Sequence, residues 1–410
     1  MKTSFFNVLD LETVLALSTG FAPVDSETVR LRDLGGRVLA ETVTAEEDVP
    51  GFSRSTMDGY AVRGSSTFGA SEANPAYLIV KGSIAMGEIP EMTVGPGEAV
   101  RIATGGMLPE DADSIVMIEY TELLDETTLE VCKSVAPGQH VIQRGEDVRS
   151  GDRLLLPGRR IRPQETGLLA ALGREEACVY RIPRIGIIST GDEIVPVSRV
   201  PGPGQVRDIN TATLFELCRQ QGAEPVPYGL VKDDFDAILD ACTKAAASCD
   251  AVLISGGSSV GTRDFTIDAL ERLPDSEIMV HGVSISPGKP TILSRSGHRM
   301  IWGLPGHATS AMVVFAALVR PFIDRIAGVD SRYTRSRSIT AVLTRNVASA
   351  QGRTDFVRVR LSENNGSTMA EPIPGKSGLI STMVKADGLL RIDAESEGVD
   401  AGTVVEIEPF

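Results

Sequence analysis

Cysteine and histidine are scarce in this 410-residue chain, and their scarcity argues against disulfide frameworks and zinc sites. The five cysteines are odd in number, contain no C-x-x-C pair and are spread through core-like segments, so we expect reduced thiols in a cytoplasmic protein. The four histidines, at positions 140, 281, 298 and 307, are too scattered for zinc-ligand spacing. Only His307 lies in a loop that suggests a site.

Long apolar runs and an excess of basic residues are also absent. No run approaches the roughly 20 apolar residues that a membrane-spanning helix needs, and the amino terminus does not read as a secretion signal. We therefore expect a soluble protein that is not exported. The 40 basic and 55 acidic residues give a net charge of −15, which argues against a sequence-independent binder of nucleic acid backbones.

The residues that are present suit several folded domains. Hydrophobic residues make up 42% of the chain, enough for real cores, and the length predicts about two to four domains. We expect a multidomain fold of the α/β plus β class, with a discontinuous helical linking domain, a β-rich insert, an α/β domain and a small C-terminal β domain like a barrel. The expected boundaries, in that order, are 1–47 with 145–182, 48–144, 183–329 and 330–410.

Local patterns predict the elements within these domains. Residues 3–18 and 26–40 look helical, and proline at 163 with glycine at 173 delimits a further helix. From 183 to about 328 strands and helices alternate, which is typical of a parallel sheet with helices on both faces. Asn365-Gly366 predicts a hairpin turn in the C-terminal domain.

A glycine-rich loop follows one of the apolar strands. The strand at 251–254 runs directly into SGGSSVGTRD, residues 255–264. Its glycines permit positive φ and close backbone approach, so that successive N–H groups can converge on a phosphate. A tight turn that simply needs glycine is the alternative interpretation. The expected phosphate contacts are Ser255, Gly256, Gly257, Ser258 and Gly261.

Acidic residues follow a second strand. The strand at 184–189 ends in Thr190-Gly-Asp192-Glu193, at the edge of an α/β sheet where ligands bind. Two adjacent carboxylates on a glycine turn repel each other, and a divalent cation such as Mg²⁺ relieves that repulsion. Asp208 and Asp234 are either helix caps or part of the same site.

Several further segments, together with these two loops, resemble the molybdopterin molybdenumtransferase family. Residues 48–62, DVPGFSRSTMDGYAV, are similar to its signature. The other matching motifs occur in the family's order along the chain: RIATGG at 101, RGED at 144, STGDE at 189, SGGSSVGTRD at 255, PGKP at 287 and GLPG at 303. The family is related to the C-terminal part of gephyrin, and its α/β domain resembles molybdopterin adenylyltransferase.

The resemblance implies a transferase that inserts molybdate into adenylylated molybdopterin, with magnesium-dependent release of AMP. It further implies a homodimer whose active site lies between the α/β domain of one subunit and the β-rich insert of the other. Molybdopterin adenylyltransferase is then a candidate partner. Neither nucleic acid nor a membrane is expected.

The resemblance also implies roles for single residues. Asp58 is the best candidate for an essential carboxylate, with an Asx-turn as the structural alternative, and Thr104 is either an oxyanion donor or a turn residue. Lys289 would neutralise phosphate or molybdate. The remaining assignments are metal or nucleotide binding for Asp192 and Glu193, phosphate or metal contacts for Asp233 and Asp264, and substrate binding for Pro305 and His307.

This chain departs from the family pattern near the expected oxyanion site. His307 and Ala308 replace asparagine and proline, and Ser286 stands where a basic residue is common. These changes either tune the site, conceivably towards tungstate, or are neutral. A nucleotidyltransferase that makes the adenylate and a non-catalytic, gephyrin-like scaffold are the rival functions. The presence of Asp58 and Asp264 favours the enzyme.

Overall fold

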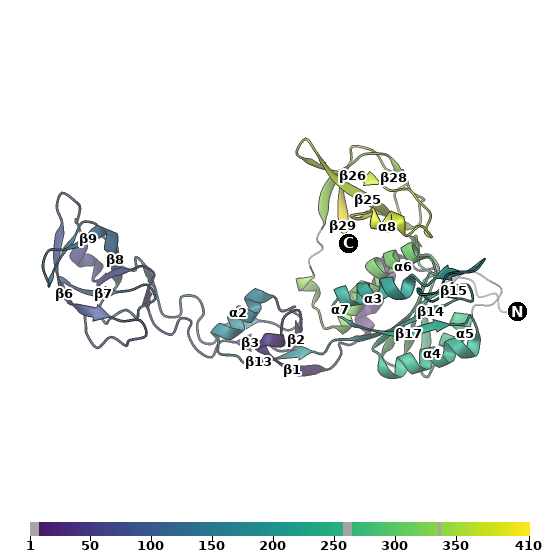
Figure 1. Ribbon diagram of the computed structural model, residues 1–410, viewed down its shortest axis with the longest axis horizontal. Helices are drawn as coiled ribbons and strands as arrows, with labels where there is room; N and C mark the ends of the chain where they lie inside the picture. The colour runs from purple at the N-terminus through teal and green to yellow at the C-terminus, as the bar shows by residue number, and fades with distance from the viewer. Residues whose placement is uncertain (1–7, 257–264, 335–337) are drawn as a thin grey trace. The chain divides into compact units, whose positions relative to one another are not determined.

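The computed structural model describes residues 8–256, 265–334 and 338–410 (Figure 1). No helix among these residues is long and apolar enough to span a membrane. The chain divides into two compact units. The first unit holds residues 1–41, 157–163 and 176–410, and the second holds residues 42–156 and 164–175.

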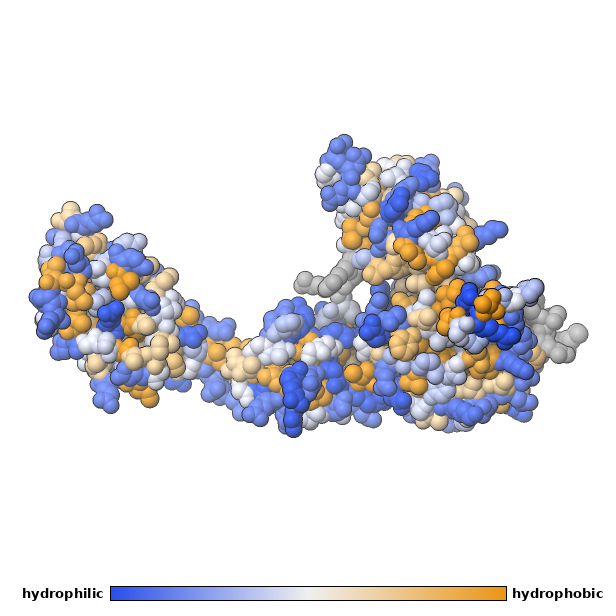
Figure 2. Space-filling view, viewed as in Figure 1, coloured by the Kyte–Doolittle hydropathy of each residue, from blue (hydrophilic) through white to orange (hydrophobic). Residues whose placement is uncertain are grey.

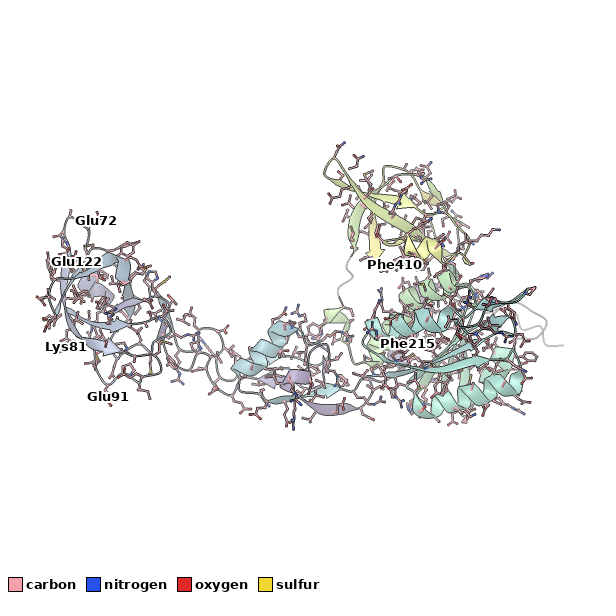
Figure 3. The ribbon with its side chains drawn as sticks, viewed as in Figure 1. Glu72, Lys81, Glu91, Glu122, Phe215 and Phe410 are labelled. Carbon is pink, nitrogen blue, oxygen red and sulfur yellow. The ribbon has the colours of Figure 1, made fainter. Side chains whose placement is uncertain are left out.

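The second unit is built on a six-stranded sheet with the strand order β8-β5-β7-β6-β10-β9. The strands are β5 (Gly59–Val62), β6 (Ala76–Ile84), β7 (Glu98–Ile102), β8 (Ser114–Met117), β9 (Thr121–Leu123) and β10 (Thr128–Val131). Val62, Leu78 and Val116 pack in its buried core, whereas Glu72 and Glu122 are exposed (Figure 3). The β-rich segment predicted from the sequence is therefore present.

Short elements complete the second unit. Two antiparallel strand pairs and one helix make up this set: β3 (Val43–Thr44) with β12 (Arg153–Leu155), β4 (Arg54–Ser55) with β11 (Val141–Ile142), and α2 (Pro163–Ala171). Helix α2 begins at the predicted proline. It is followed by Gly173, whose φ of 68° is the left-handed conformation expected after a helix end.

The amino-terminal region differs from the predicted pair of helices. The first helix is shorter than predicted: α1 (Leu11–Ala16) begins after Asp10, whose carboxylate caps its first turn. The second, predicted at 26–40, is wrong, because β1 (Ser26–Arg30) pairs antiparallel with β13 (Glu176–Tyr180). A partner strand so distant in the sequence overrides the local helical pattern. The same sheet is completed by β2 (Val38–Leu39).

A six-stranded sheet with the order β17-β14-β18-β22-β21-β19 forms the α/β part of the first unit. Its strands are β14 (Arg184–Thr190), β17 (Glu224–Val231), β18 (Ala251–Ser255), β19 (Ser276–His281), β21 (Ile292–Ser296) and β22 (Arg299–Leu304). The four strands β17, β14, β18 and β22 are parallel, as predicted. β21 runs in the opposite direction, because Gly297 and His298 turn it directly back into β22. The edge strand β19 pairs antiparallel with β21 and therefore runs in the same direction as the other four.

Helices cover both faces of this sheet, as the alternating pattern predicted. They are α3 (Asn210–Gln220), α4 (Phe235–Ser248), α5 (Phe265–Glu271), α6 (Ala308–Val314) and α7 (Arg320–Ile326). Leu214 of α3 packs with Trp302 on one face. Ile238 of α4 packs with Ile254 on the other. Burial on both faces explains why the central strands are apolar along their whole length.

The strand order reverses between β14 and β18. The chain runs from β14 through α3 to β17 on one side, then through α4 to β18 on the other side of β14. Ligands of open α/β sheets bind at the carboxyl ends of strands where the order reverses in this way. Thr190 and Ser255, the last residues of β14 and β18, therefore mark the candidate site.

The C-terminal region is a closed five-stranded barrel. Its strands are β23 (Ile339–Leu343), β25 (Thr354–Asn364), β26 (Ser367–Pro372), β27 (Gly388–Ile392) and β29 (Val404–Pro409). Asn365 and Gly366 join β25 to β26 with φ of 50° and 77°, which confirms the predicted hairpin turn. The barrel is tied to the α/β part through β20 (Ile285–Ser286), which pairs with the start of β25.

Candidate functional site at the strand ends

The ends of β14 and β18 are joined through buried hydroxyl groups. Ser189 Oγ lies 3.1 Å from Ser255 Oγ and 2.9 Å from Thr211 Oγ1, and it donates to Asp208 Oδ1 at 3.1 Å. The same carboxylate oxygen accepts the N–H of Thr211 at 3.1 Å. Asp208 therefore serves the first turn of α3, as the capping interpretation expected, and it also orients Ser189.

Gly256 is the second residue of the predicted phosphate loop and cannot be replaced there without strain. Its φ is 104°, and an added Cβ would lie 2.1 Å from the carbonyl oxygen of Thr190. The hydroxyl of Thr190 is buried and has no hydrogen-bond partner among the described residues. A buried hydroxyl without a partner costs free energy, and a ligand oxygen at this edge would remove that cost. The rest of the predicted loop, with Gly257, Ser258, Gly261 and Asp264, lies outside the described residues.

The predicted acidic residues lie in the loops after β14 and β17. The N–H of Asp233 donates to Asp192 Oδ1 at 3.4 Å, which brings the two loops together. Partial burial raises the pKa of Asp233, and the charges of Asp192 and Glu193 raise it further. Within the described part of the chain, no three His, Cys, Asp or Glu side chains are grouped closely enough to hold a metal ion.

The loop after β22 carries two of the predicted substrate-binding residues. Pro305 is buried and His307 is exposed. Asn210 Nδ2 donates to the carbonyl oxygen of Gly306 at 2.8 Å, and the buried Oδ1 of Asn210 has no partner among the described residues. The imidazole Nδ1 of His307 lies 3.2 Å from the Ser377 hydroxyl of the barrel. Sequence reasoning missed this contact and the unpaired amide oxygen of Asn210, since neither has a local signal.

Lys289 is exposed, and the conformation of its buried neighbour Gly288 fixes the loop that carries it. Gly288 has a φ of 126°, and an added Cβ would lie 2.5 Å from a methyl group of Val314 in α6. Glycine at this position therefore lets the loop pack against α6. The ammonium group of Lys289 has no ion-pair partner in the described part of the chain, which leaves its charge available for an anion.

The second unit brings Asp58 and Thr104 together. Oδ1 of Asp58 accepts the N–H of Thr104 at 2.7 Å and its hydroxyl at 2.8 Å. These two bonds hold the pKa of Asp58 below its ordinary value, and the charge of Arg101 contributes in the same direction. Gly59 follows, and a Cβ there would lie 2.0 Å from the carbonyl oxygen of Val116. The carboxylate thus bonds to a distant loop rather than forming an Asx-turn.

The fold and the site define a multidomain protein whose α/β part offers a ligand site at its strand ends. Three family models match the chain: "MoeA N-terminal region (domain I and II)" over residues 9–173, "Probable molybdopterin binding domain" over 186–325, and "MoeA C-terminal region (domain IV)" over 340–410. The chain belongs to the MoeA, or molybdopterin molybdenumtransferase, family, which confirms the resemblance seen in the motifs.

Individual relatives are similar over nearly their whole length. The chain is 34% identical to the molybdopterin molybdenumtransferase of Haemophilus influenzae, covering 95% of both chains. It is 32% identical to that of Bacillus subtilis, covering 93% of this chain and 89% of the relative. The crystal structure of a molybdopterin biosynthesis MoeA protein from Pyrococcus horikoshii OT3 matches with a TM-score of 0.85 at 30% identity, over 98% of this chain and all of that chain.

Proposed function

We propose that this protein is a molybdopterin molybdenumtransferase. It would insert molybdate into adenylylated molybdopterin and release AMP. The observation that carries the proposal is the reversal of strand order between β14 and β18. Gly256 lies against Thr190 there, and the buried hydroxyl of Thr190 has no hydrogen-bond partner within the described residues. This edge lies in the part of the chain that matches the molybdopterin binding domain. Backbone N–H groups after Gly256 would bind the pyrophosphate of the substrate.

The net reaction needs a site that handles two anions. Water cleaves the phosphoanhydride, so that AMP leaves and the pterin keeps its own phosphate. The two sulfurs of the dithiol replace oxygen atoms of molybdate, and these oxygens leave as water with protons from the thiols and the solvent. Lys289 would neutralise phosphate or molybdate, and Pro305 with His307 would lie against the substrate. Ionised Asp58, held by Thr104, would act from the facing wall of the site.

Magnesium is the cation that we propose for the carboxylates in the loops after β14 and β17. Burial raises the pKa of Asp233, and the charges of Asp192 and Glu193 raise it further. A divalent cation would relieve the repulsion among these three carboxylates. Asp192, Glu193 and Asp264 would hold the ion, and phosphate oxygens of the substrate would complete its ligands. The ion would supply charge neutralisation for the departing phosphate.

The assembly completes the proposal. The protein would act as a homodimer in the cytoplasm, with Asp58 and Thr104 of one subunit facing the strand ends of the other. Molybdopterin adenylyltransferase would be the source of its substrate. The four-domain division expected from the sequence stays a prediction.

Release of AMP from adenylylated molybdopterin tests the function. The purified protein is assayed with Mg²⁺, with and without molybdate or tungstate, alongside Asp58→Asn. The matched control is Asp125→Asn, since Asp125 is an exposed aspartate in the same unit that also accepts a threonine N–H. We expect release that needs an oxyanion and is lost only in Asp58→Asn. Tight substrate binding without release would instead indicate the scaffold function, and release with tungstate alone would indicate a tungstate-selective enzyme.

A further inference from the structure

A cavity of about 640 Å³ lies beside the candidate site, between α3 and the segment 194–207. We call this segment the flap. It contains two short strands that pair in parallel, β15 (Ile194–Val195) and β16 (Val206–Arg207). The cavity is lined by Val197 of the flap, Phe215 of α3 (labelled in Figure 3) and Leu230 of β17. Its volume is in the range of small-molecule sites.

The walls of this cavity are apolar and reachable from solvent. Val197 is 64% exposed and Leu230 is 37% exposed, although both side chains are hydrophobic. Phe215 is half-buried, so part of its ring packs on the core and part remains for a ligand. Figure 2 shows hydrophobic residues at the surface in the region where Figure 1 labels β15. Apolar surface that is gathered around a cavity is typical of a binding site.

The polar side chains that line the cavity are two carboxylates and the hydroxyl of Thr211. Asp208 and Glu216 both line it, and Glu216 is ion-paired with Arg219 at 2.9 Å. Oδ2 of Asp208 has no hydrogen-bond partner in the described part of the chain. A free carboxylate oxygen repels phosphate and molybdate, but it accepts N–H donors. The cavity therefore suits a neutral, flat ring with N–H groups.

The cavity is also close to the predicted phosphate loop. Asp208 Oδ1 accepts from Ser189 Oγ at 3.1 Å, and Ser189 Oγ lies 3.1 Å from Ser255 Oγ. Ser255 immediately precedes Gly256. Two contacts of about hydrogen-bond length thus connect a residue that lines the cavity to the first residue of the loop.

We propose that this cavity binds a heteroaromatic ring of the substrate, with Phe215, Val197 and Leu230 against the ring and Asp208 accepting its N–H groups. The inference rests on the proposed function, because that substrate carries an uncharged ring on either side of its pyrophosphate. Adenine and the pterin are both neutral, flat rings with N–H groups. The experiment distinguishes them.

Binding of substrate fragments to the full chain tests the proposal. Adenosine, a free pterin and inorganic pyrophosphate are titrated separately against the wild type, Val197→Asp and Val200→Asp, with binding followed by ligand-detected NMR. Val200 is the matched control, since it lies in the same flap, is 80% exposed and does not line the cavity. Because both valines are exposed, both variants should melt at the wild-type temperature.

One ring should bind to the wild type, and Val197→Asp should weaken it by roughly tenfold or more, since a charge there opposes a desolvated ring. Val200→Asp should leave ring binding unchanged, and pyrophosphate should bind equally to all three proteins. If Val197→Asp weakens the binding of adenosine, the cavity binds the adenine ring of the substrate. If it weakens the binding of the free pterin, the cavity binds the pterin ring. Absence of ring binding to the wild type, or equal ring binding to both variants, would overturn the proposal.

The outcome for the cavity is separable from the outcome for the proposed function. AMP release by the wild type together with ring binding that Val197→Asp does not change would leave the function standing and remove the cavity from the site. Ring binding lost in Val197→Asp, without AMP release by the wild type under any condition, would support the ring site and contradict the transferase activity.

Discussion

Oδ1 of Asp58 accepts two hydrogen bonds from a single residue, the N–H of Thr104 at 2.7 Å and its hydroxyl at 2.8 Å. Two loops that are 46 residues apart in the chain are thereby joined at one carboxylate oxygen. The arrangement keeps Asp58 ionised and fixed in orientation, which is what a preorganised catalytic carboxylate requires.

Thr104→Val is expected to lower AMP release by roughly tenfold, because it removes one of the two hydrogen bonds to a charged group and keeps the other. The Thr104 bonds lower the pKa of Asp58, so their loss should move the acid limb of the pH–rate profile upward. For the same reason, the stability that these bonds contribute is present above the unfolded pKa of Asp58 and disappears as the pH falls through its folded pKa.

The pH–rate profile of Thr104→Val, with Thr104→Ser beside it, is the measurement. Serine restores the hydroxyl, so its profile should return towards that of the wild type. An acid limb identical in all three proteins would show that Asp58 is not the group that limits the rate at low pH.

Gly256→Ala is expected to cost more stability than Gly297→Ala. Both glycines have positive φ, which costs alanine about 1 kcal/mol or more. Only the Cβ at 256 meets another atom, the carbonyl oxygen of Thr190 at 2.1 Å, whereas the Cβ at 297 meets nothing within 4 Å. Urea denaturation of the two variants compares their free energies of unfolding. Equal losses would mean that the strand ends can separate without cost.

Asn210→Leu is expected to lower the free energy of unfolding by about 1 to 3 kcal/mol, because it removes the donor to the carbonyl oxygen of Gly306. The loop that carries His307 should also lose its position, so AMP release should fall further than stability alone explains. Thr213→Val is the control on the same helix, since its hydroxyl donates only to a backbone carbonyl within α3. Full activity of Asn210→Leu would contradict a role for this link.

Asp233→Asn is expected to stabilise the protein in the absence of magnesium and to reduce the stabilisation that magnesium brings. The pKa of Asp233 is raised in the folded state, so its ionisation opposes folding, and this cost appears as the pH rises through the folded pKa. Magnesium should offset the cost, raising the wild-type Tm by roughly 2 to 4 °C at neutral pH and by less in acid.

Thermal melting at two pH values, with and without Mg²⁺, checks this prediction. Asp234→Asn is the matched control, because Asp234 caps α4 through the N–H of Ala237 and asparagine caps equally well. A magnesium response that is the same in Asp233→Asn and in the wild type would remove Asp233 from the ion's surroundings.

Local patterns in the sequence predicted those parts of the fold whose physical cause is local. Asn365-Gly366 has the two residues that tolerate positive φ in a two-residue turn, and Pro163 suits the first turn of a helix. The alternation of strands and helices after residue 183 could be predicted because the central strands are buried on both faces. Such strands are apolar along their whole length, so their composition reveals them. The helix predicted at 26–40 failed because β1 is stabilised by β13, and a local window does not contain that partner.

The family, the order of the motifs and the residue types at the candidate site could all be read from the amino-acid sequence, since chemistry depends on which side chains are present. Which of these side chains lie close together follows from the three-dimensional fold. The bond from Asn210 to Gly306 joins residues 96 positions apart, and the contact of His307 with Ser377 joins residues 70 apart. Such contacts form because sheet order and barrel closure bring distant segments together, and no local pattern encodes that arrangement.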